Sequence, residues 1–397
     1  MLAYKFRIYP TKSQERLLKE TLETCRHLYN DLLFSRIQSG IGVWGLQASL
    51  PKMKAESKYL AAVHSQVLQG VNFKLDKAFQ AFFAGIAGHP KFRRKGTCKS
   101  FTYPQYGGFR IDGNRLKLSK LGRVRIRLHR PIQGTPKTCT IVKDIDQWYA
   151  CISAEAPESN TSRASSGRWV GVDFGLTNIA ILSDGASIPN PKFLANSLGK
   201  LKSLQRALTK KQSGSRNREK AKIRLEKAWR TVRRQRDDFA HKVSHRLTNE
   251  NEFVVFEDLK IRSMVKTHSF ASAIMDSTWG KLRQLTAYKA ERRGGRVILV
   301  NPSGTSQKCS GCGVMNPKMK DLSRRVFECD ACGLVLDRDV NAARNVLQAG
   351  QELARVEAQP LLVQRRRISK LANEAKSPPL LAVGSSPIAQ GGSIPVH

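Results

Sequence analysis

The first part of the chain alternates between apolar and basic side chains and then changes to helical spacing. Residues 3–9 alternate as a strand with one buried face does, with Tyr4, Phe6 and Ile8 set against Lys5 and Arg7. After Pro10, apolar residues at helical spacing run from Thr11 to about residue 38, and a second amphipathic stretch covers about 61–85. This pattern predicts a strand at residues 1–10 and a helical bundle at residues 11–88.

Short alternating segments follow one another from there to about residue 157, separated by turn residues such as Asp112 and Gly113. The predicted strands are Phe109–Ile111, Leu116–Leu118, Val124–Leu128, Cys139–Val142 and Trp148–Ile152. Short strands at regular spacing are typical of a small barrel. We therefore expect a β-barrel at residues 89–157, with the helical bundle inserted after its first strand.

A polar segment at residues 158–167 is typical of a linker, and the pattern changes after it. Apolar runs predict buried strands at Trp169–Phe174, Ile179–Ser183, Phe253–Phe256 and Val297–Val300. Two long basic helices are predicted within residues 192–249, and a further helix at Trp279–Arg293. Residues 168–304 are therefore expected to form an α/β domain.

The last part of the chain contains a cysteine-rich module at residues 305–336 and a helix at about 339–349 within a final segment, 337–350. Beyond residue 350 no steady period is visible, and the composition is rich in Pro, Ser, Gly and Arg. This composition predicts a basic, mostly disordered tail at residues 351–397. The whole chain is thus expected to be a multidomain protein of the α/β plus β class.

The charge of the chain narrows the class of partner. The sequence has 69 Lys and Arg residues and 31 Asp and Glu residues, a formal net charge of +38. A surface this cationic repels itself unless polyanions neutralise it, and nucleic acid fits because each cation placed on a phosphate releases counterions. A solvated basic surface is the alternative. Because neither a membrane-spanning apolar run nor a signal peptide is found, we expect no membrane partner and a cytoplasmic, nucleoid-associated location.

The cysteines fall into two groups. Four are scattered, as expected for reduced thiols that pack like small apolar residues: Cys25, Cys98, Cys139 and Cys151. The other four form two C-x-x-C pairs whose separation is typical of a zinc site: Cys309, Cys312, Cys329 and Cys332. Four sulfur ligands leave no open position, so a single structural zinc ion is expected. A disulfide pairing is the alternative, and it requires an oxidising compartment.

Acidic residues are scarce, so those at the ends of predicted elements stand out. Asp173 and Glu257 each end a strand, and Asp337 and Asp339 lie at a helix start. An RNase H-like sheet can bring two strand-end acids and one helix-start acid together, where they can hold two Mg²⁺ ions about 4 Å apart. Each acid also has a simpler interpretation: Asp173 as a turn residue, Glu257 as a solvated strand end and Asp339 as a helix N-cap. Their occurrence together in an RNase H-like order favours the metal site.

Several short motifs resemble, in the same order, the TnpB (OrfB) proteins of bacterial insertion sequences, which are relatives of the type V CRISPR effector nucleases. The matching motifs span about residues 1–350: Tyr4–Thr11, Pro90–Arg94, Gly171–Gly175, Phe256–Leu259, Thr305–Cys312, Cys329–Gly333 and Asp337–Ala343. Any one of these motifs would be weak, but the ordered set is specific.

The resemblance implies an architecture and an activity. The N-terminal part resembles a wedge barrel with an inserted recognition bundle, and the C-terminal part resembles an RNase H-like RuvC nuclease core with a zinc-ribbon insert. Family members bind a guide RNA from the transposon end and cut double-stranded DNA that pairs with it, beside a short target-adjacent motif. By motif, Asp173, Glu257 and Asp339 are the implied catalytic acids and Mg²⁺ ligands, with support from Arg338 and Asn341. Asp339 is preferred to its neighbouring acid because it directly precedes Val-Asn-Ala-Ala.

Contacts with nucleic acid are expected from the basic loop at residues 91–95, the barrel, the helix pair 192–249 and one helix of the bundle. The residues predicted for this role are Lys91, Arg93, Arg94, Lys95, Arg123, Arg125, Arg127, Gln69 and Arg338. For Gln69, an ordinary position on a bundle helix is the alternative.

Four other functions remain open at this stage: an RNA-guided DNA binder or repressor that does not cut, a small CRISPR effector, a transposition accessory protein, and a zinc-stabilised RNA-binding protein without enzyme activity. The presence of all three acids argues against a non-cutting repressor. We expect one protein monomer per guide RNA, in a bacterial or archaeal cytoplasm.

Overall fold

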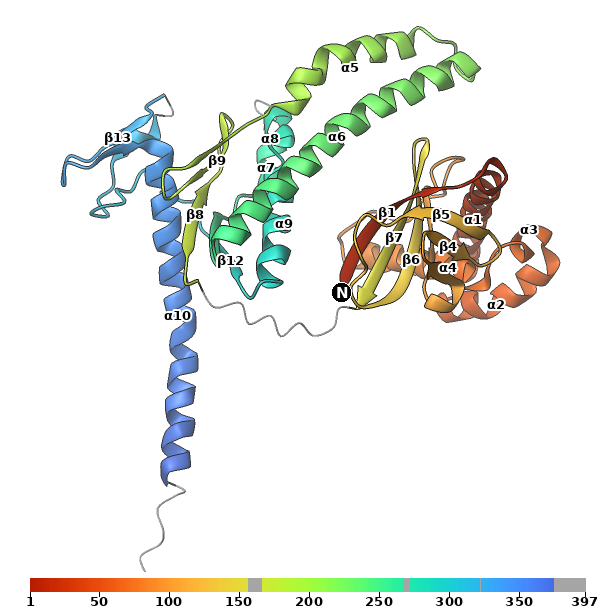
Figure 1. Cartoon of the computed structure of the whole chain (residues 1–397), viewed down its shortest axis with the longest axis horizontal. Helices are drawn as coiled ribbons and strands as arrows, with labels where there is room; N and C mark the ends of the chain where they lie inside the picture. The colour runs from red at the N-terminus through yellow and green to blue at the C-terminus, as the bar shows by residue number, and fades with distance from the viewer. Residues whose placement is uncertain (156–165, 267–270, 322, 375–397) are drawn as a thin grey trace, which may run out of the picture. The chain divides into compact units, whose positions relative to one another are not determined.

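The computed structural model describes residues 1–155, 166–266, 271–321 and 323–374 (Figure 1). Most of the predicted linker, and the predicted tail beyond residue 374, lie outside these residues. The chain divides into two compact units, Met1–Asn160 with Lys211–Lys227 and Thr161–Lys210 with Ala228–His397. Each unit has its own apolar core. In the part of the chain that the structure describes, no helix has the length and apolar character needed to cross a membrane.

The first unit is built on a seven-stranded antiparallel sheet in the order β2-β6-β7-β1-β5-β4-β3. The strands that were expected from the alternating pattern are all present, and β2 is an additional one. The strands are β1 Leu2–Tyr9, β2 Ser100–Tyr103, β3 Phe109–Asp112, β4 Arg115–Leu118, β5 Gly122–Arg127, β6 Thr135–Asp144 and β7 Gln147–Glu155.

This sheet curls but keeps two edge strands, β2 and β3. A short connection containing a 3₁₀ turn, Tyr106–Gly108, joins these two edges directly, so they lie close together. The Tyr103 hydroxyl on β2 donates a 2.9 Å hydrogen bond to the carbonyl of Ser119, just beyond β4. The expected barrel is therefore a curled sheet in which β2 and β3 remain edge strands, with a side-chain bond from β2 to the turn after β4.

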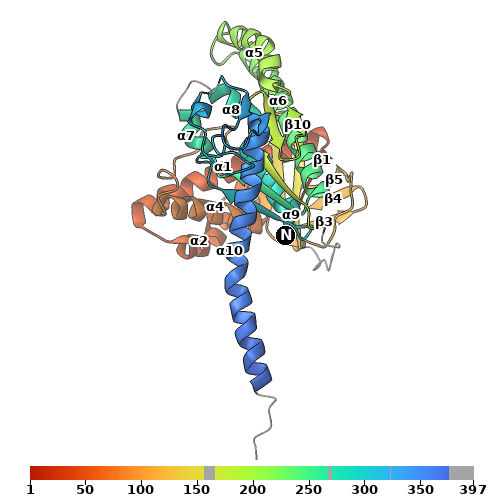
Figure 2. The same cartoon turned by 90° about the vertical axis from the view of Figure 1, so that its left-hand side faces the viewer.

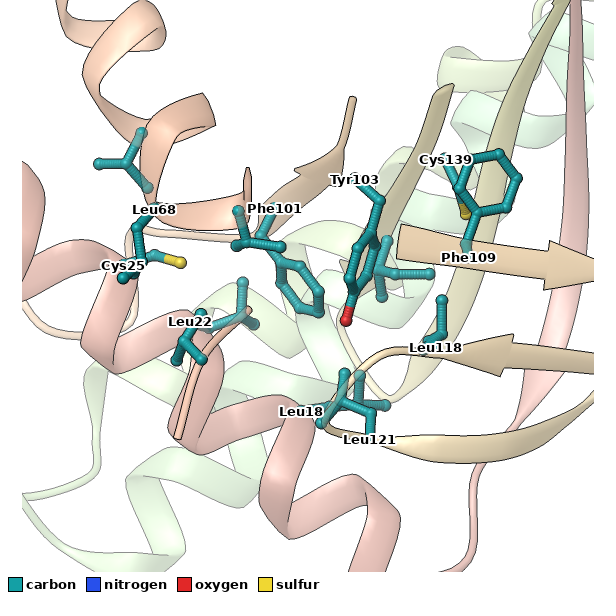
Figure 3. Close-up of a cluster of buried hydrophobic side chains, with 14 of the residues drawn as sticks. Leu18, Leu22, Cys25, Leu68, Phe101, Tyr103, Phe109, Leu118, Leu121 and Cys139 are labelled. Carbon is teal, nitrogen blue, oxygen red and sulfur yellow. The ribbon is translucent and has the colours of Figure 1, made fainter. Parts of the chain in front are cut away.

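Four helices follow β1: α1 Lys12–Ser39, α2 Val43–Glu56, α3 Lys58–Ala61 and α4 Ser65–Phe83. Helices α1 and α4 pack against β2 of the sheet and against each other, while α2 packs against α3 and α4. Thr11 begins α1 with a capping box, in which its hydroxyl accepts from the Gln14 N–H and the Gln14 side chain accepts from the Thr11 N–H. Figure 3 shows side chains from α1, α4 and the sheet meeting in one core, which includes the buried Cys25 and Cys139.

The second unit is built on a five-stranded mixed sheet in the order β10-β9-β8-β11-β12. The central strand β8 is parallel to β11, which is parallel to β12, whereas β9 runs antiparallel to both of its neighbours, β8 and β10. The strands are β8 Trp169–Asp173, β9 Asn178–Leu182, β10 Ser187–Pro189, β11 Phe253–Glu257 and β12 Arg296–Val300. Except for the three-residue β10, they correspond to the apolar runs in the sequence.

The helices of the second sequence half are α5 Phe193–Thr209, α6 Arg216–Glu250, α7 Ile261–Lys266, α8 Ala271–Ser277, α9 Trp279–Glu291 and α10 Arg338–Glu374. A small module precedes α10 and contains the 3₁₀ turn Pro317–Lys320 and the strand pair β13 Val326–Glu328 and β14 Val335–Asp337. Helix α10 runs alongside β8 (Figure 1), and the turned view in Figure 2 shows it continuing beyond the sheet.

The length of α10 differs from the expectation of a mostly disordered tail from residue 351, because the helix continues through Glu374. At the start of this extension Ala354 packs against the apolar cluster on the sheet, and an exposed 2.7 Å ion pair joins Glu357 to Arg296 of β12. These contacts join segments far apart in the sequence, so the local pattern did not reveal them.

Gly171 in the centre of β8 permits the close approach of α10. A Cβ atom at this position would overlap the carbonyl oxygen of Ala343 and would lie 2.7 Å from the backbone nitrogen of Leu347. Both atoms belong to the α10 backbone, which cannot turn aside as a flexible side chain can. The absence of a side chain at residue 171 therefore sets the distance between helix and strand.

Gly171→Ala should lower the free energy of unfolding by about 3 kcal/mol, because the added methyl group pushes α10 away from the sheet. Thermal or denaturant unfolding measures this change. Gly199→Ala is the matched control: Gly199 lies in α5 with open space around it, so alanine should stabilise the protein by about 0.5–1 kcal/mol. Equal stability of Gly171→Ala and the unsubstituted protein would contradict the close packing.

Candidate functional site

Two of the predicted acids lie side by side at the carboxyl ends of parallel strands. In the register between β8 and β11, Phe256 is opposite Val172, so Glu257 and Asp173 follow at matching positions. Stacking of Phe174 on Phe256, with ring centres 5.1 Å apart, fixes the backbone just beyond these strands. The strand pairing alone therefore brings the two carboxylates to one edge of the sheet.

The third acid comes from the first turn of α10, and its neighbour has a different role. The Asp337 carboxylate accepts hydrogen bonds from the backbone N–H groups of Asp339 (2.9 Å) and Val340 (3.1 Å). These are the bonds of a helix N-cap. Because Asp337 caps the helix, the Asp339 carboxylate is not needed for capping. The capping bonds thus distinguish the role of Asp337 from that of Asp339, which spacing alone could not do.

The carboxylates influence one another. Burial, followed by the charges of Glu257 and Asp339, raises the pKa of Asp173 well above its usual range, while Arg338 opposes this shift. Burial also raises the pKa of Glu257 and that of Asp339, and the charge of Asp337 adds to the shift of Asp339. Three neighbouring acids whose pKa values are all raised are suited to binding a positive charge.

The donor chemistry of this cluster fits Mg²⁺, which prefers a few carboxylates together with retained water and phosphate. The Thr305 hydroxyl donates a 2.6 Å hydrogen bond to Glu257 Oε1, which leaves the other carboxylate oxygen for a cation. In the described ranges, the acids do not gather their oxygens within 4.8 Å of one another. Carboxylates that share two cations about 4 Å apart need not bring all their oxygens within 4.8 Å of one another.

The four module cysteines do form a tight cluster. All four sulfur atoms lie within 4.8 Å of one another, and two pairs are 3.6 Å apart, Cys309 with Cys332 and Cys312 with Cys329. Thiolates placed tetrahedrally around zinc, at 2.3 Å from it, are about 3.8 Å apart. The cluster can therefore hold one zinc ion with no open position.

Each C-x-x-C pair lies in a tight backbone turn that we call a knuckle, the first at residues 309–313 and the second at residues 329–333. Gly313 N–H donates to the Cys309 carbonyl and Gly333 N–H to the Cys329 carbonyl, both at 2.9 Å. Both glycines have positive φ, 81° and 72°, a conformation that glycine adopts without strain. Backbone N–H groups of Cys332 and Ala331 lower the pKa of Cys329 to about 7, which favours the thiolate.

Arg338 was expected to contact nucleic acid, but its side chain is buried and bonded within the protein. Its side chain is 5% exposed and donates to the carbonyls of Asp321 (2.6 Å) and Arg324 (3.3 Å) in the module before α10. Its charge also opposes the raised pKa of Asp173 and of Asp339. These contacts give Arg338 a supporting position between the module and the acids, with little surface left for a phosphate.

The basic loop after α4 presents cations and is anchored by one of them. Lys91, Arg94 and Lys95 are exposed, whereas the Arg93 guanidinium lies 3.7 Å from the centre of the Tyr29 ring. The backbone of Arg93 is also bonded to the side chain of Asn30 in both directions. Arg93 therefore holds the loop on α1, and its neighbours remain the predicted nucleic-acid contacts.

Arg123, Arg125 and Arg127 point outward from β5, where cations face one another across the strands. The cross-strand pairs are Arg7 with Arg127, Arg115 with Arg125 and Lys117 with Arg123. Like charges directly opposite each other destabilise a sheet unless an anion neutralises them. Gln69 is half-buried on α4.

Sequence reasoning missed Thr305, Asn345 and Gln348, whose side chains bond to the site or to the first knuckle. The available signal was weak: an amide residue four positions after Asn341 in a helix, and a threonine at the start of the Thr305–Cys312 motif. Neither position identifies its partner, because the partner is distant in sequence.

Family models match three parts of the chain. A model described as "Probable transposase" matches residues 150–268, one described as "Cas12f1-like, TNB domain" matches residues 279–346, and one described as "Helix-turn-helix domain" matches residues 1–39. The structure has one strand and one helix in the last of these ranges, β1 and α1.

Similar proteins cover nearly the whole chain. A "Putative RNA-guided DNA endonuclease" of Streptomyces pristinaespiralis is 34% identical, with 88% of this chain and 89% of the relative covered. A "Putative RNA-guided DNA endonuclease InsQ" of Escherichia coli is 31% identical, with 88% and 92% covered. The "TnpB-like protein L79" of Acanthamoeba polyphaga mimivirus is 24% identical, with 87% and 72% covered.

The chain belongs to the TnpB family. The resemblance expected from the ordered motifs is therefore confirmed by relatives that match across both units of this TnpB protein. The acids of the TnpB chain also lie in ranges that the family models match, Asp173 and Glu257 in the first and Asp339 in the second.

The raised pKa of Asp173 predicts a pH-dependent stability for the metal-free protein. The folded state binds this proton more tightly than the unfolded state does, so stability should fall as pH rises from the usual aspartate range through the raised pKa. Asp173→Asn removes the ionisation and should flatten this decline and raise the melting temperature at neutral pH. Melting curves of chelator-treated protein between pH 5 and 8 measure it.

Asp238→Asn is the control for this experiment, because Asp238 is exposed on α6 and forms an i,i+4 ion pair with Lys242. It should leave the pH profile unchanged. A parallel profile for Asp173→Asn and the unsubstituted protein would show that charging Asp173 carries no cost in the fold.

Cys329→Ser should abolish zinc binding, since three thiolates and a hydroxyl do not replace four thiolates. We expect zinc content to fall from about one ion per chain to near zero, and proteolytic cleavage within residues 305–336 to become fast. Cys151→Ser, a half-buried cysteine on β7 outside the cluster, should keep the zinc. Retained zinc in Cys329→Ser would contradict the four-cysteine site.

Proposed function

We propose that the chain is an RNA-guided, Mg²⁺-dependent DNA endonuclease. It would bind a guide RNA from the transposon end and cut DNA that pairs with this guide, beside a short target-adjacent motif. The observation that carries the proposal is the meeting of Asp173, Glu257 and Asp339, from three separate segments, at the carboxyl end of parallel strands. The two relatives above 30% identity are named as putative RNA-guided DNA endonucleases, which supports the same reaction class.

The sheet order supports an RNase H-like, RuvC-type core for this reaction. Three antiparallel strands, β10, β9 and β8, are followed by β11 and β12 parallel to β8, with α10 packed on the central strand. In such a sheet the carboxyl end of β8 lies beside that of β11, and a helix that starts there can bring a third acid. The four-cysteine module would then be a zinc ribbon inserted before this last helix.

The proposed mechanism assigns separate tasks to the residues of this site. Asp173, Glu257 and Asp339 would hold two Mg²⁺ ions, which when bound supply activation of the attacking water and stabilisation of the leaving oxygen. Asp173 must lose its proton before it can bind a cation, since its pKa is raised. Thr305 keeps one oxygen of Glu257 engaged and so orients the other. The cap made by Asp337 fixes the first turn of α10 and thereby the position of Asp339.

Guide RNA and target DNA would be held by cationic surfaces, while base pairing reads the sequence. The outward side chains of β1, β4 and β5 support this, because three pairs of cations face one another directly across these strands. Arginines there also lie over aromatic rings, with Arg7 5.4 Å from the centre of Tyr9. Polyanions would relieve this repulsion, and exposed Lys91, Arg94 and Lys95 would add to the same electrostatic attraction.

A non-cutting, RNA-guided DNA binder is the second candidate. A non-cutting binder needs the cationic surfaces, but it does not explain why three acids with raised pKa values lie together. Purification from cells that carry the native flanking DNA, followed by sequencing of the bound RNA, tests the part common to both candidates. A discrete RNA from the element's end supports them, and the absence of any discrete RNA contradicts them.

Asp339→Asn should reduce guided DNA cleavage by at least about 100-fold, because a bound cation contributes several kcal/mol to the transition state. RNA binding should stay unchanged, since the substitution alters only the acid cluster. Cleavage of a target plasmid in Mg²⁺, with RNA affinity measured in parallel, gives both values.

Asp337→Asn is the matched control two residues away. Asparagine caps helices as well as aspartate does, so cleavage should stay within about threefold of the unsubstituted protein. The opposite result, with Asp337→Asn inactive and Asp339→Asn active, would overturn the assignment of the third acid.

A further inference from the structure

Three amide side chains on one stripe of α10 bond to the backbone of the zinc module. Asn341 accepts from Ser310 N–H (2.9 Å) and donates to the Lys308 carbonyl (2.8 Å). One turn later, Asn345 donates to the carbonyls of Lys308 (2.6 Å) and Thr305 (2.8 Å). Gln348 donates to the Ser310 carbonyl (2.8 Å). Five directed bonds therefore join the helix to residues 305–310, two of them to Ser310 in the first knuckle.

This interface is polar although it is buried, with Asn341 at 0% and Asn345 at 5% exposure. Apolar side chains could hold a helix against a loop without the cost of desolvating amides. Hydrogen-bonded amides add a defined register, because a small displacement breaks several bonds at once. Asparagine is also a weak helix former, so its repetition on one stripe is a cost to the helix that this register offsets.

The segment held by these amides contacts one acid directly and is bonded to the helix turn that carries another. Thr305 lies at its start and donates through its hydroxyl to Glu257 Oε1 at 2.6 Å. Asn341 lies two residues after Asp339 on the same helix turn. Cys309, one of the four cysteines, lies between Lys308 and Ser310, whose backbone groups form hydrogen bonds with the amides. A single short stretch thus connects Glu257, the first knuckle and Asp339.

We propose that Asn341, Asn345 and Thr305 are positioning residues that set the spacing of Glu257 and Asp339, and hence the affinity of the acid cluster for its divalent cation. The zinc module would then act on the nuclease site through this segment, as a spacer whose shape depends on the first knuckle. This inference rests on the proposed function, because it assigns the cation affinity of that same site.

The test compares Thr305→Val and Thr305→Ser, together with Asn345→Ala. Valine matches threonine in shape but cannot donate to Glu257, whereas serine keeps the hydroxyl. We expect Thr305→Val and Asn345→Ala to raise the Mg²⁺ concentration for half-maximal cleavage about tenfold, with the rate at saturating Mg²⁺ within about threefold. Thr305→Ser should resemble the unsubstituted protein. Glu352→Ala, an exposed position further along α10, is the control.

A second readout does not depend on activity. The rise in melting temperature on adding Mg²⁺ to the zinc-loaded protein should need about tenfold more Mg²⁺ in Thr305→Val and in Asn345→Ala, while zinc content stays at about one per chain. An unchanged Mg²⁺ dependence in both variants would overturn the inference, as would a lower maximal rate at unchanged half-saturation. If the unsubstituted protein cut no guided target at any Mg²⁺ concentration, the proposed function itself would fail, and the melting shifts would still decide the coupling.

Discussion

The contact between α10 and the central strand β8 is the constraint on which the site depends. Helix and strand can approach this closely only because residue 171 is glycine, whose missing side chain leaves room for the backbone at Ala343 and Leu347. One turn before Ala343 lies Asp339, and two residues after Gly171 lies Asp173. Packing in the apolar interior of the second unit therefore decides the separation of two acids at its edge.

The cluster that results carries an electrostatic cost. A buried carboxylate is disfavoured in its ionised form unless a cation binds it. The pKa values of Asp173, Glu257 and Asp339 are therefore all raised. The neighbouring elements limit this cost: Arg338 opposes it from the first turn of α10, and Thr305 satisfies one oxygen of Glu257. A site built in this way is less stable empty than occupied, as expected of a cation-binding centre.

Much of the site could be predicted from the sequence because its signals are local. The two C-x-x-C pairs, the glycines that follow them, and the acids at strand ends and at a helix start depend on neighbours within a few residues. The strands of both sheets were likewise visible as alternating or continuous apolar runs, apart from β2 and the short β10. Helices α2, α3, α7 and α8 were missed; α2, for example, buries only Leu46 and Leu50 and contains Pro51, which weakens its periodic pattern.

The remaining features are tertiary and could not be read from spacing. Arg338 resembles any other cation in a basic chain until the structure shows its guanidinium bonded to backbone carbonyls of the module. The start of the α10 extension contacts the sheet through Ala354 and through Glu357, which pairs with Arg296 about sixty positions away. The capping role of Asp337 likewise became visible only in the bonds of the folded helix start, whereas the sequence preferred Asp339 by motif alone. In each case the partner lies outside the local window, or the deciding bond exists only once the chain has folded.

The most direct test of the central claim is the binding of Mn²⁺ to the zinc-loaded protein without nucleic acid, followed by electron paramagnetic resonance. If acids from three segments form one divalent-cation site, then Asp173→Asn, Glu257→Gln and Asp339→Asn should each weaken Mn²⁺ binding, and Asp337→Asn should leave it unchanged. Binding that is the same in all four variants as in the unsubstituted protein would contradict the account.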